Sequence, residues 1–235
     1  MKKILTALAV LAAFAFVFKN TIHAKKNEKS GQKSKKENLS SEDVIKKLTE
    51  WDKKLKTFQC NFVQTINYGD DTGVKSKSKG KIYLSKQPEN LRIEHGGKQK
   101  QIIYTDKKII WIHQPEVQVT KSYWNDWIEQ YKKSFSGLVD LGSYKSMIDS
   151  HNTKVLQKKI IELVMTPKKN PKLYTLTVFI AKKDFFPKEL KFTIDKITII
   201  TKLKKVKRNE KIPAEIFKFT RPEGLPFIDF TKDKT

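Results

Sequence analysis

The feature that most constrains the fold is an alternation of side-chain character that begins at Thr57. From Phe58 to Tyr68 the even-numbered positions are mostly apolar and the odd-numbered positions are mostly polar. Successive side chains of a β-strand point to opposite faces, so this period of two predicts a long strand with one apolar face. Such a strand needs neighbours of the same kind, which predicts a sheet with one buried side.

Similar strands follow along most of the chain, separated by turn-forming residues. The segment 69–73 predicts a hairpin turn, Pro88 a corner and Asp106 a tight turn. The expected strands are 57–68, 74–86, 91–95, 101–105, 108–113, 117–121, 155–165, 173–181, 188–194, 197–206 and 215–220. About eleven strands in meander order predict a mainly β protein with a strongly curved antiparallel sheet, or open half barrel.

Two segments have helical periodicity instead. Ser40 followed by Asp43 resembles a capping box, and apolar residues at spacings of three and four then predict a helix over about 41–56. Between about 123 and 147, aromatic and aliphatic residues again fall at helical spacing, past Gly137 and Gly142. We expect one or two short helices there, hinged at the glycines and lying across the mouth of the sheet.

The first 24 residues have the pattern of a signal peptide. Two lysines follow Met1, an apolar run of 15 residues extends to Phe18, and a small residue, Ala24, offers a cleavage site. The run is shorter than the roughly 20 residues that span a bilayer. We expect export across a bacterial-type inner membrane and cleavage near Ala24, with no cysteine nearby to carry a lipid. Residues 25–39 predict a disordered, lysine-rich tether, and 40–230 a single domain.

The net charge of +24 favours anionic partners, among them phospholipid head groups, acidic proteins and nucleic acid. Only three of the 49 basic residues are arginine, the side chain that recognises phosphates and bases in a bidentate manner. We therefore interpret the charge as a bias that keeps the protein soluble and near anionic membrane, and we expect no nucleic-acid partner.

Few residues predict chemistry. The histidines are not spaced with cysteines or carboxylates as in a metal site, and Cys60, the only cysteine, lies on the apolar face of a strand. The segment around Ser136 lacks the pattern of a nucleophile elbow, and no glycine-rich phosphate loop is present. We expect no metal, no cofactor and no catalytic residue, and hence a protein that is not an enzyme.

Four segments resemble, in the same order, the LolA-type outer-membrane lipoprotein carriers. They are Phe58–Gln64, Pro88–Glu94, Asp106–Val119 and Phe217–Gly224, and residues 163–168 are similar to a fifth. The resemblance covers about residues 41–228. It implies a half-open barrel of eleven strands with a helical lid over a hydrophobic cavity. It also implies a monomeric periplasmic chaperone that takes acylated lipoproteins from an inner-membrane ABC-type releasing complex to an outer-membrane acceptor.

The resemblance also implies roles for particular residues. The expected cavity wall comprises Phe58, Phe62, Ile82, Leu84, Ile93, Ile103 and Trp111, and the expected lid residues are Trp127, Phe135 and Leu138. A shift of one residue within a strand would exchange a wall residue for its neighbour. Leu91 corresponds to the residue that docks on the transporter. Lys86 and Gln87 stand where the family has an arginine that latches the lid.

Two other functions remain open at this stage. The first is a sensor or lipid carrier that binds a lipid or lipoprotein on the same fold. The second is a secreted hydrolase whose carboxylate site the sequence does not single out. An ordinary, completely filled core would also give the observed alternation, because periodicity does not distinguish a filled interior from a hollow one.

Overall fold

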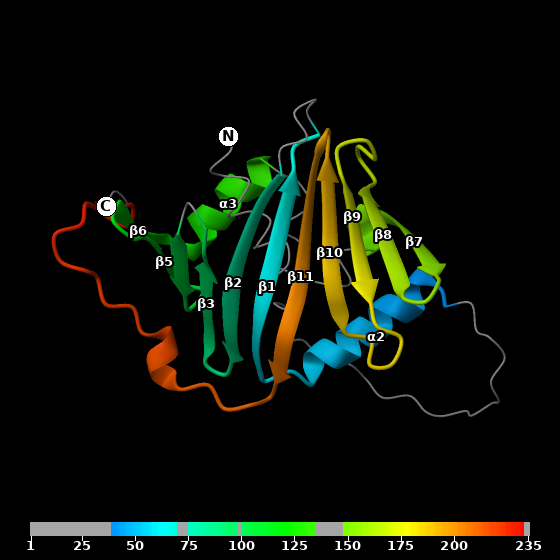
Figure 1. Cartoon of the computed structure of the whole chain (residues 1–235), viewed down its shortest axis with the longest axis horizontal. Helices are drawn as coiled ribbons and strands as arrows, with labels where there is room; N and C mark the ends of the chain where they lie inside the picture. The colour runs from blue at the N-terminus through cyan, green and yellow to red at the C-terminus, as the bar shows by residue number, and fades with distance from the viewer. Residues whose placement is uncertain (1–38, 70–74, 98–99, 135–147, 233–235) are drawn as a thin grey trace.

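The computed structural model describes residues 39–69, 75–97, 100–134 and 148–232. Within them, twelve strands form one sheet in the order β12-β6-β5-β4-β3-β2-β1-β11-β10-β9-β8-β7 (Figure 1). The strands are β1 (Thr57–Asn67), β2 (Lys75–Lys86), β3 (Glu89–His95), β4 (Gln101–Thr105), β5 (Ile109–Gln114), β6 (Gln118–Tyr123), β7 (His151–Gln157), β8 (Ile161–Pro167), β9 (Thr175–Ile180), β10 (Pro187–Ile194), β11 (Ile197–Arg208) and β12 (Phe227–Asp229). The prediction of a curved, open, mainly antiparallel sheet is confirmed.

Two of the expected strands are wrong in detail. The segment 155–165 is not one strand, because residues 158–160 turn the chain between β7 and β8. The segment 215–220 contains a short 3-10 helix, η2 (Ala214–Phe217), and β12 lies farther along the chain. Both errors arise in short elements, where a few residues of alternation do not distinguish a strand from a turn.

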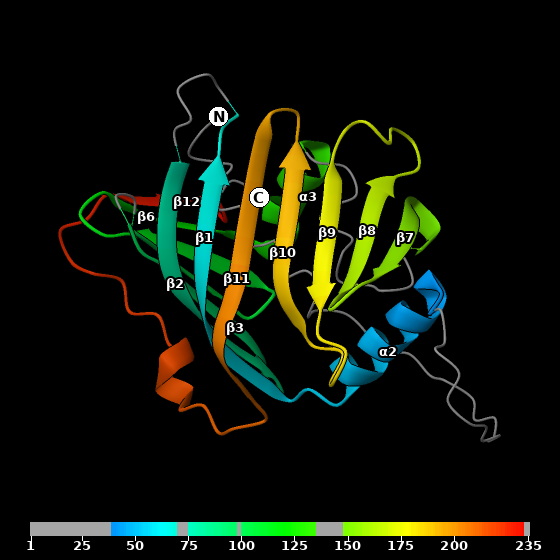
Figure 2. The same ribbon diagram turned by 45° about the vertical axis from the view of Figure 1, so that its right-hand side comes forward.

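The long strands β1 and β11 pair side by side in the middle of the sheet, although about 140 residues separate them in sequence. Strand β1 also pairs with β2, so its backbone is hydrogen-bonded on both sides. Figure 2 shows β11 between β1 and β10 in this central position. The end strands β12 and β7 do not pair with each other, so the sheet curves without closing.

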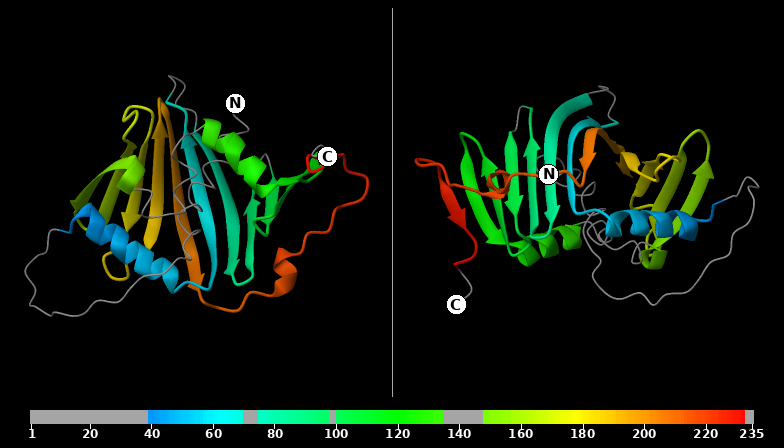
Figure 3. Two further views of the ribbon diagram at one scale, coloured as in Figure 1. Left: turned by 180° about the vertical axis from the view of Figure 1, so that it is seen from behind. Right: turned by 90° about the horizontal axis from the view of Figure 1, so that it is seen from below.

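Two described helices lie on one face of the sheet, which we call the concave face (Figure 3). The helix α2 (Ser41–Lys53) has the predicted capping box, in which the Asp43 amide donates to Ser40 Oγ at 3.1 Å and the Ser40 amide donates to Asp43 Oδ2 at 2.9 Å. The helix α3 (Trp124–Ser134) follows β6 directly and packs near β5 and β6. Neither is long and apolar enough to cross a membrane.

The C-terminal segment lies on the other face, which we call the convex face (Figure 1). The Arg92 guanidinium on β3 donates to the carbonyl oxygen of Ile216 at 3.0 Å. The Phe219 ring then packs against Tyr104 and Trp111, with ring centroids 5.0 and 4.9 Å apart. Strand β12 ends the segment by pairing in parallel with β6. Part of the convex face of β3 to β6 is therefore covered by the chain itself.

Candidate functional site

Two rows of apolar side chains cross the concave face at right angles to the strands, one residue from each strand in the pairing register. The first apolar row is formed by Cys60, Ile82, Ile93 and Ile103 on β1 to β4. The second apolar row is formed by Ile66, Ile199, Phe192, Leu176 and Met165 on β1, β11, β10, β9 and β8. Every member is at most 6% exposed, and all belong to one hydrophobic cluster that also includes side chains of α2 and α3.

A polar pair is set among these apolar side chains. Gln64 on β1 is fully buried, and its Nε2 donates to Thr201 Oγ1 on β11 at 3.2 Å. Among the described residues, the Oε1 atom of Gln64 has no hydrogen-bond partner. A buried acceptor without a donor costs free energy, so this atom is an unusual feature of the apolar face. The signal in the sequence is a glutamine at an even-numbered position, where the neighbouring residues are apolar.

An ion pair connects α2 to the end of β2. The Lys86 ammonium donates to both the carboxylate and the carbonyl oxygen of Asp52, each at 2.8 Å. Asp52 is 2% exposed, and burial raises the pKa of its carboxyl while Lys86 opposes the rise. The C-terminal end of α2 is therefore fixed to the sheet by a buried charge and its partner.

Three side chains of types that often carry chemistry, Cys60, His95 and His151, are buried. Burial raises the pKa of the Cys60 thiol to about 12, so it does not act as a nucleophile near neutral pH. His95 Nε2 lies 3.0 Å from Ser78 Oγ, but no described carboxylate orients the ring as in a catalytic triad. His151 lies between Ser150 and Tyr174 at 2.8 and 2.7 Å. The described residues contain no group of three or more side chains suited to a metal ion.

Most of the chain is similar to one known protein family. Residues 53–220 match the family described as outer membrane lipoprotein carrier protein LolA. The chain belongs to the LolA family. This match extends from the end of α2 to the segment after η2, and so it includes both apolar rows. No protein of curated function matches the sequence.

Several solved structures are similar to this LolA family member at low sequence identity. An uncharacterized conserved protein from Thermus thermophilus is 12% identical, with a TM-score of 0.53, and the match covers 81% of this chain and 99% of that one. A LolA superfamily protein from Nitrosomonas europaea is 12% identical, with a TM-score of 0.41 and coverages of 77% and 98%. The lipoprotein LppX of Mycobacterium tuberculosis is 11% identical, with a TM-score of 0.45 and coverages of 74% and 99%.

The structure brings six of the seven expected wall residues of the LolA family together on the concave face. They are Phe58, Phe62, Ile82, Leu84, Ile93 and Ile103, each at most 3% exposed. The ring of Phe62 lies over Gly80 of the neighbouring strand, where a Cβ atom would collide with it. These side chains form a continuous apolar surface over β1 to β4.

Trp111, the seventh, lies on the convex face. It pairs in register with Tyr104, and its ring lies 4.9 Å from Phe219 and 5.9 Å from Phe227 between centroids. Its neighbours Ile110 and Ile112 take the concave positions of β5. The register of this strand is therefore one residue away from the one that would turn Trp111 inward.

Of the three expected lid residues, Trp127 lies on α3, is 7% exposed and stacks on Trp124 at a centroid distance of 5.5 Å. Phe135 and Leu138 lie outside the described residues. Lys86, one of the two expected latch residues, bonds α2 as described above, while Gln87 is exposed at the corner before Pro88. The latch contact thus involves the first described helix and not α3.

Leu91, the expected docking residue, is 3% exposed and faces the apolar cluster beside Leu84. Its side chain is not accessible to a partner in this structure. The family motif placed it at the corner after Pro88, where the sequence alone does not show that β3 has already begun at Glu89.

Proposed function

We propose that the protein is a periplasmic carrier of lipoproteins that binds their acyl chains on the concave face of its sheet. In this proposal it receives acylated lipoproteins from an inner-membrane ABC-type releasing complex and delivers them to an outer-membrane acceptor. It acts as a monomer after export and cleavage near Ala24. The single observation that supports the proposal is the pair of apolar rows that crosses an open sheet in a member of the LolA family.

The energy of hydration explains why such a surface is needed. Each methylene group moved from an apolar environment into water costs about 0.8 kcal/mol, so exposing several long acyl chains costs tens of kcal/mol. A concave apolar sheet removes most of that cost by surrounding the chains. Because the end strands β12 and β7 do not pair with each other, the two ends of the sheet can move apart without breaking a strand pair, while Lys86 keeps α2 in place.

In this proposal the polar pair of Gln64 and Thr201 sets the orientation of the bound lipid on the concave face. Acyl chains contact the apolar rows, and the free Oε1 of Gln64 accepts a hydrogen bond from an amide or hydroxyl group next to them. This would fix the depth at which the lipid end of the cargo sits. The buried ion pair of Lys86 and Asp52 holds α2 in place at the opposite end of β2.

Mass spectrometry of the protein purified from the periplasm tests the proposal directly. We expect lipoproteins to co-purify, and we expect the pure protein to release radiolabelled lipoprotein from inner-membrane vesicles. Co-purified free lipid with no release activity would favour a lipid carrier or sensor. Turnover of a panel of lipid and glycan esters would favour a hydrolase. An empty protein that releases nothing would refute the carrier proposal.

Two neighbouring residues on β4 provide a matched pair of variants. Ile103 is 2% exposed in the first apolar row, whereas Ile102 lies on the convex face and is half-buried. We expect Ile103→Ser to weaken the binding of a diacylated lipopeptide by about tenfold or more, and Ile102→Ser to leave it unchanged. The free energy of unfolding of both variants is measured in parallel, so that a loss of fold is not read as a loss of binding.

A further inference from the structure

The convex face of the central strands is lined with lysines. On β2 they occupy every second position, Lys75, Lys77, Lys79 and Lys81, and all are exposed. Strand β11 adds Lys202 and Lys204 on the same face, because they pair with Val63 and Asn61 of β1, which in turn pair with Lys79 and Lys81. Two rows of ammonium groups therefore run along the sheet, on either side of β1.

The spacing of these rows follows from sheet geometry. Adjacent strands are about 4.8 Å apart, so the two lysine rows stand roughly 10 Å apart, and lysines within a row are about 7 Å apart. Between the rows, β1 presents only shorter side chains, among them Asn61 and Val63. The shorter side chains of β1 therefore lie between two rows of lysines, and we call this arrangement the lysine channel.

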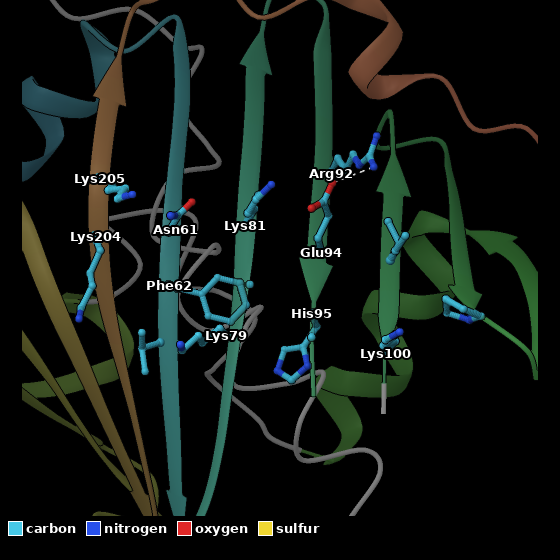
Figure 4. A pocket seen from close by; sticks show the side chains of 15 residues that line it. Asn61, Phe62, Lys79, Lys81, Arg92, Glu94, His95, Lys100, Lys204 and Lys205 are labelled. Atoms are coloured by element: carbon cyan, nitrogen blue, oxygen red, sulfur yellow. Dashed lines mark ion pairs between the residues drawn. The ribbon is translucent and has the colours of Figure 1, made fainter. Parts of the chain in front are cut away.

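A groove of about 690 Å³ opens over this channel and extends across β3 and β4 (Figure 4). Six cationic side chains line it, Lys79, Lys81, Arg92, Lys100, Lys204 and Lys205. Glu94 is the one acidic side chain in the lining, and it is already paired with Arg92 at 2.7 Å. Val63, Ile102 and Pro115 add apolar surface between the charges.

Most of these cationic side chains have no acidic partner among the described residues. Among the described residues, the ion pairs include Lys202 with Glu189 and Arg92 with Glu94, and none includes Lys79, Lys81, Lys204 or Lys205. The C-terminal segment contacts Arg92, Tyr104 and Trp111 on the convex face but leaves the groove open. A concentrated positive field next to solvent attracts anions at close range.

We propose that this groove binds the phosphate groups of acidic phospholipids, so that the convex face rests on an anionic membrane surface while the concave face stays free. The binding site is distinct from the apolar rows, and the inference does not depend on what the concave face carries. The alternation of β1, β2 and β11 separates the two sites by the thickness of one sheet.

The residue types favour a membrane over a protein or a nucleic acid. Lysine is depleted in protein interfaces, whose binding energy comes mainly from tryptophan, tyrosine and arginine. Specific contacts to nucleic acid rely on the arginine fork, and the groove contains a single arginine that is already paired. Lysines act as point charges that attract a layer of phosphates without fixed geometry, and each contributes roughly a fivefold increase in binding near an anionic leaflet.

Vesicle co-sedimentation tests the proposal on the protein purified from the periplasmic fraction. The probes are vesicles of phosphatidylcholine alone and vesicles with about a third phosphatidylglycerol. We expect binding to the anionic vesicles only. We also expect it to be lost at about 1 M NaCl, where the Debye length falls to about 3 Å.

The groove variant Lys79→Glu/Lys81→Glu/Lys204→Glu should bind anionic vesicles on the order of 100-fold more weakly than the parent. The control variant Lys168→Glu/Lys169→Glu/Lys172→Glu has the same net charge but changes exposed lysines in the turn between β8 and β9. It should bind within about threefold of the parent. The corresponding glutamine variants remove charge without adding the opposite charge and should rank in the same order, and thermal melts verify that all variants are folded.

Equal losses in the groove and control variants would overturn the proposal, because binding would then reflect only the total charge of the chain. Binding that inorganic phosphate displaces at low millimolar concentration would also overturn it, in favour of a site for a free anion. Unchanged binding of the groove variant, or binding of an acidic peptide but not of the vesicles, would exclude a membrane-docking role. None of these outcomes alters the test of lipoprotein binding.

Discussion

The two faces of the central strands differ in burial and in charge. On β2, Ile82 and Leu84 are almost completely buried on the concave face, while Lys79 and Lys81 are exposed on the convex face. Neighbouring residues in the sequence therefore contact either an apolar interior or water. The comparison explains how a chain of net charge +24 folds around an apolar core, because the period of two directs lysines outward and leaves every second position for the core.

The largest effect on stability is expected when a charged residue replaces an apolar one on the concave face. Ile82→Asp places a carboxylate in the first apolar row, and the described residues of that hydrophobic cluster include no cation to pair with it. We expect this change to lower the free energy of unfolding by more than about 4 kcal/mol. Lys81→Asp, one residue earlier, should change it by less than about 0.5 kcal/mol. Urea unfolding of both variants measures the difference, and similar losses at the two positions would show that the faces are not distinct.

The ion pair of Lys86 and Asp52 is a charged exception inside the buried side and should give the next largest effect. Lys86→Met leaves a buried carboxylate without its partner and should cost about 3 kcal/mol at neutral pH. Removing Lys86 raises the pKa of Asp52 further, because burial already raises it and Lys86 opposes that rise. The loss should therefore shrink as the pH falls through that pKa and the carboxyl group becomes neutral.

The double variant Asp52→Leu/Lys86→Met serves as the control for this pair. It removes both charges and keeps apolar volume, so it should recover most of the stability that Lys86→Met loses. Denaturation curves at neutral and acidic pH compare the three proteins. A loss in Lys86→Met that does not depend on pH would mean that packing of the lysine stem, and not its charge, fixes α2.

The faces also show which parts of the structure could be predicted from sequence. The curvature and openness of the sheet, the capping box of α2 and the buried positions of six expected wall residues followed from periodicity, turn residues and family motifs, because these are local patterns. The face of Trp111 did not follow, since it depends on a one-residue register within a strand of six residues. The same limit applies to the break between β7 and β8.

Contacts between distant segments were the other part that the sequence did not reveal. The bonds of Lys86 to Asp52 join residues 34 positions apart, and Phe219 covers Trp111 from the far end of the chain. The lysine channel arises only when β11 pairs with β1, about 140 residues away. The composition alone does not show where the lysines lie, whereas the strand register places many of them on the convex face.

Gly80 tests how tightly the buried face is packed. A Cβ atom there would collide with the Glu94 carbonyl oxygen and with the Phe62 ring, so Gly80→Ala should cost about 1 to 3 kcal/mol. Lys79→Ala, on the convex face, should cost less than about 0.5 kcal/mol. Adding Phe62→Leu to Gly80→Ala should recover part of the loss, because only the backbone contact would remain. A harmless Gly80→Ala would indicate that the face has free space beneath Phe62.

The smallest expected effect is a difference between the two faces in how stability depends on pH. Burial lowers the pKa of His95 on the concave face and also that of His113, which is only half-buried on the convex face. An unfolded chain takes up protons at these residues near pH 6.5, before the folded chain does, so stability falls as the pH drops from about 7 to about 5. His95→Gln should reduce this fall more than His113→Gln, since the more deeply buried ring resists protonation more strongly. Urea unfolding across this range measures both slopes. If His113→Gln flattens the slope more, proton uptake would be governed by the convex face and its C-terminal cover instead of the interior.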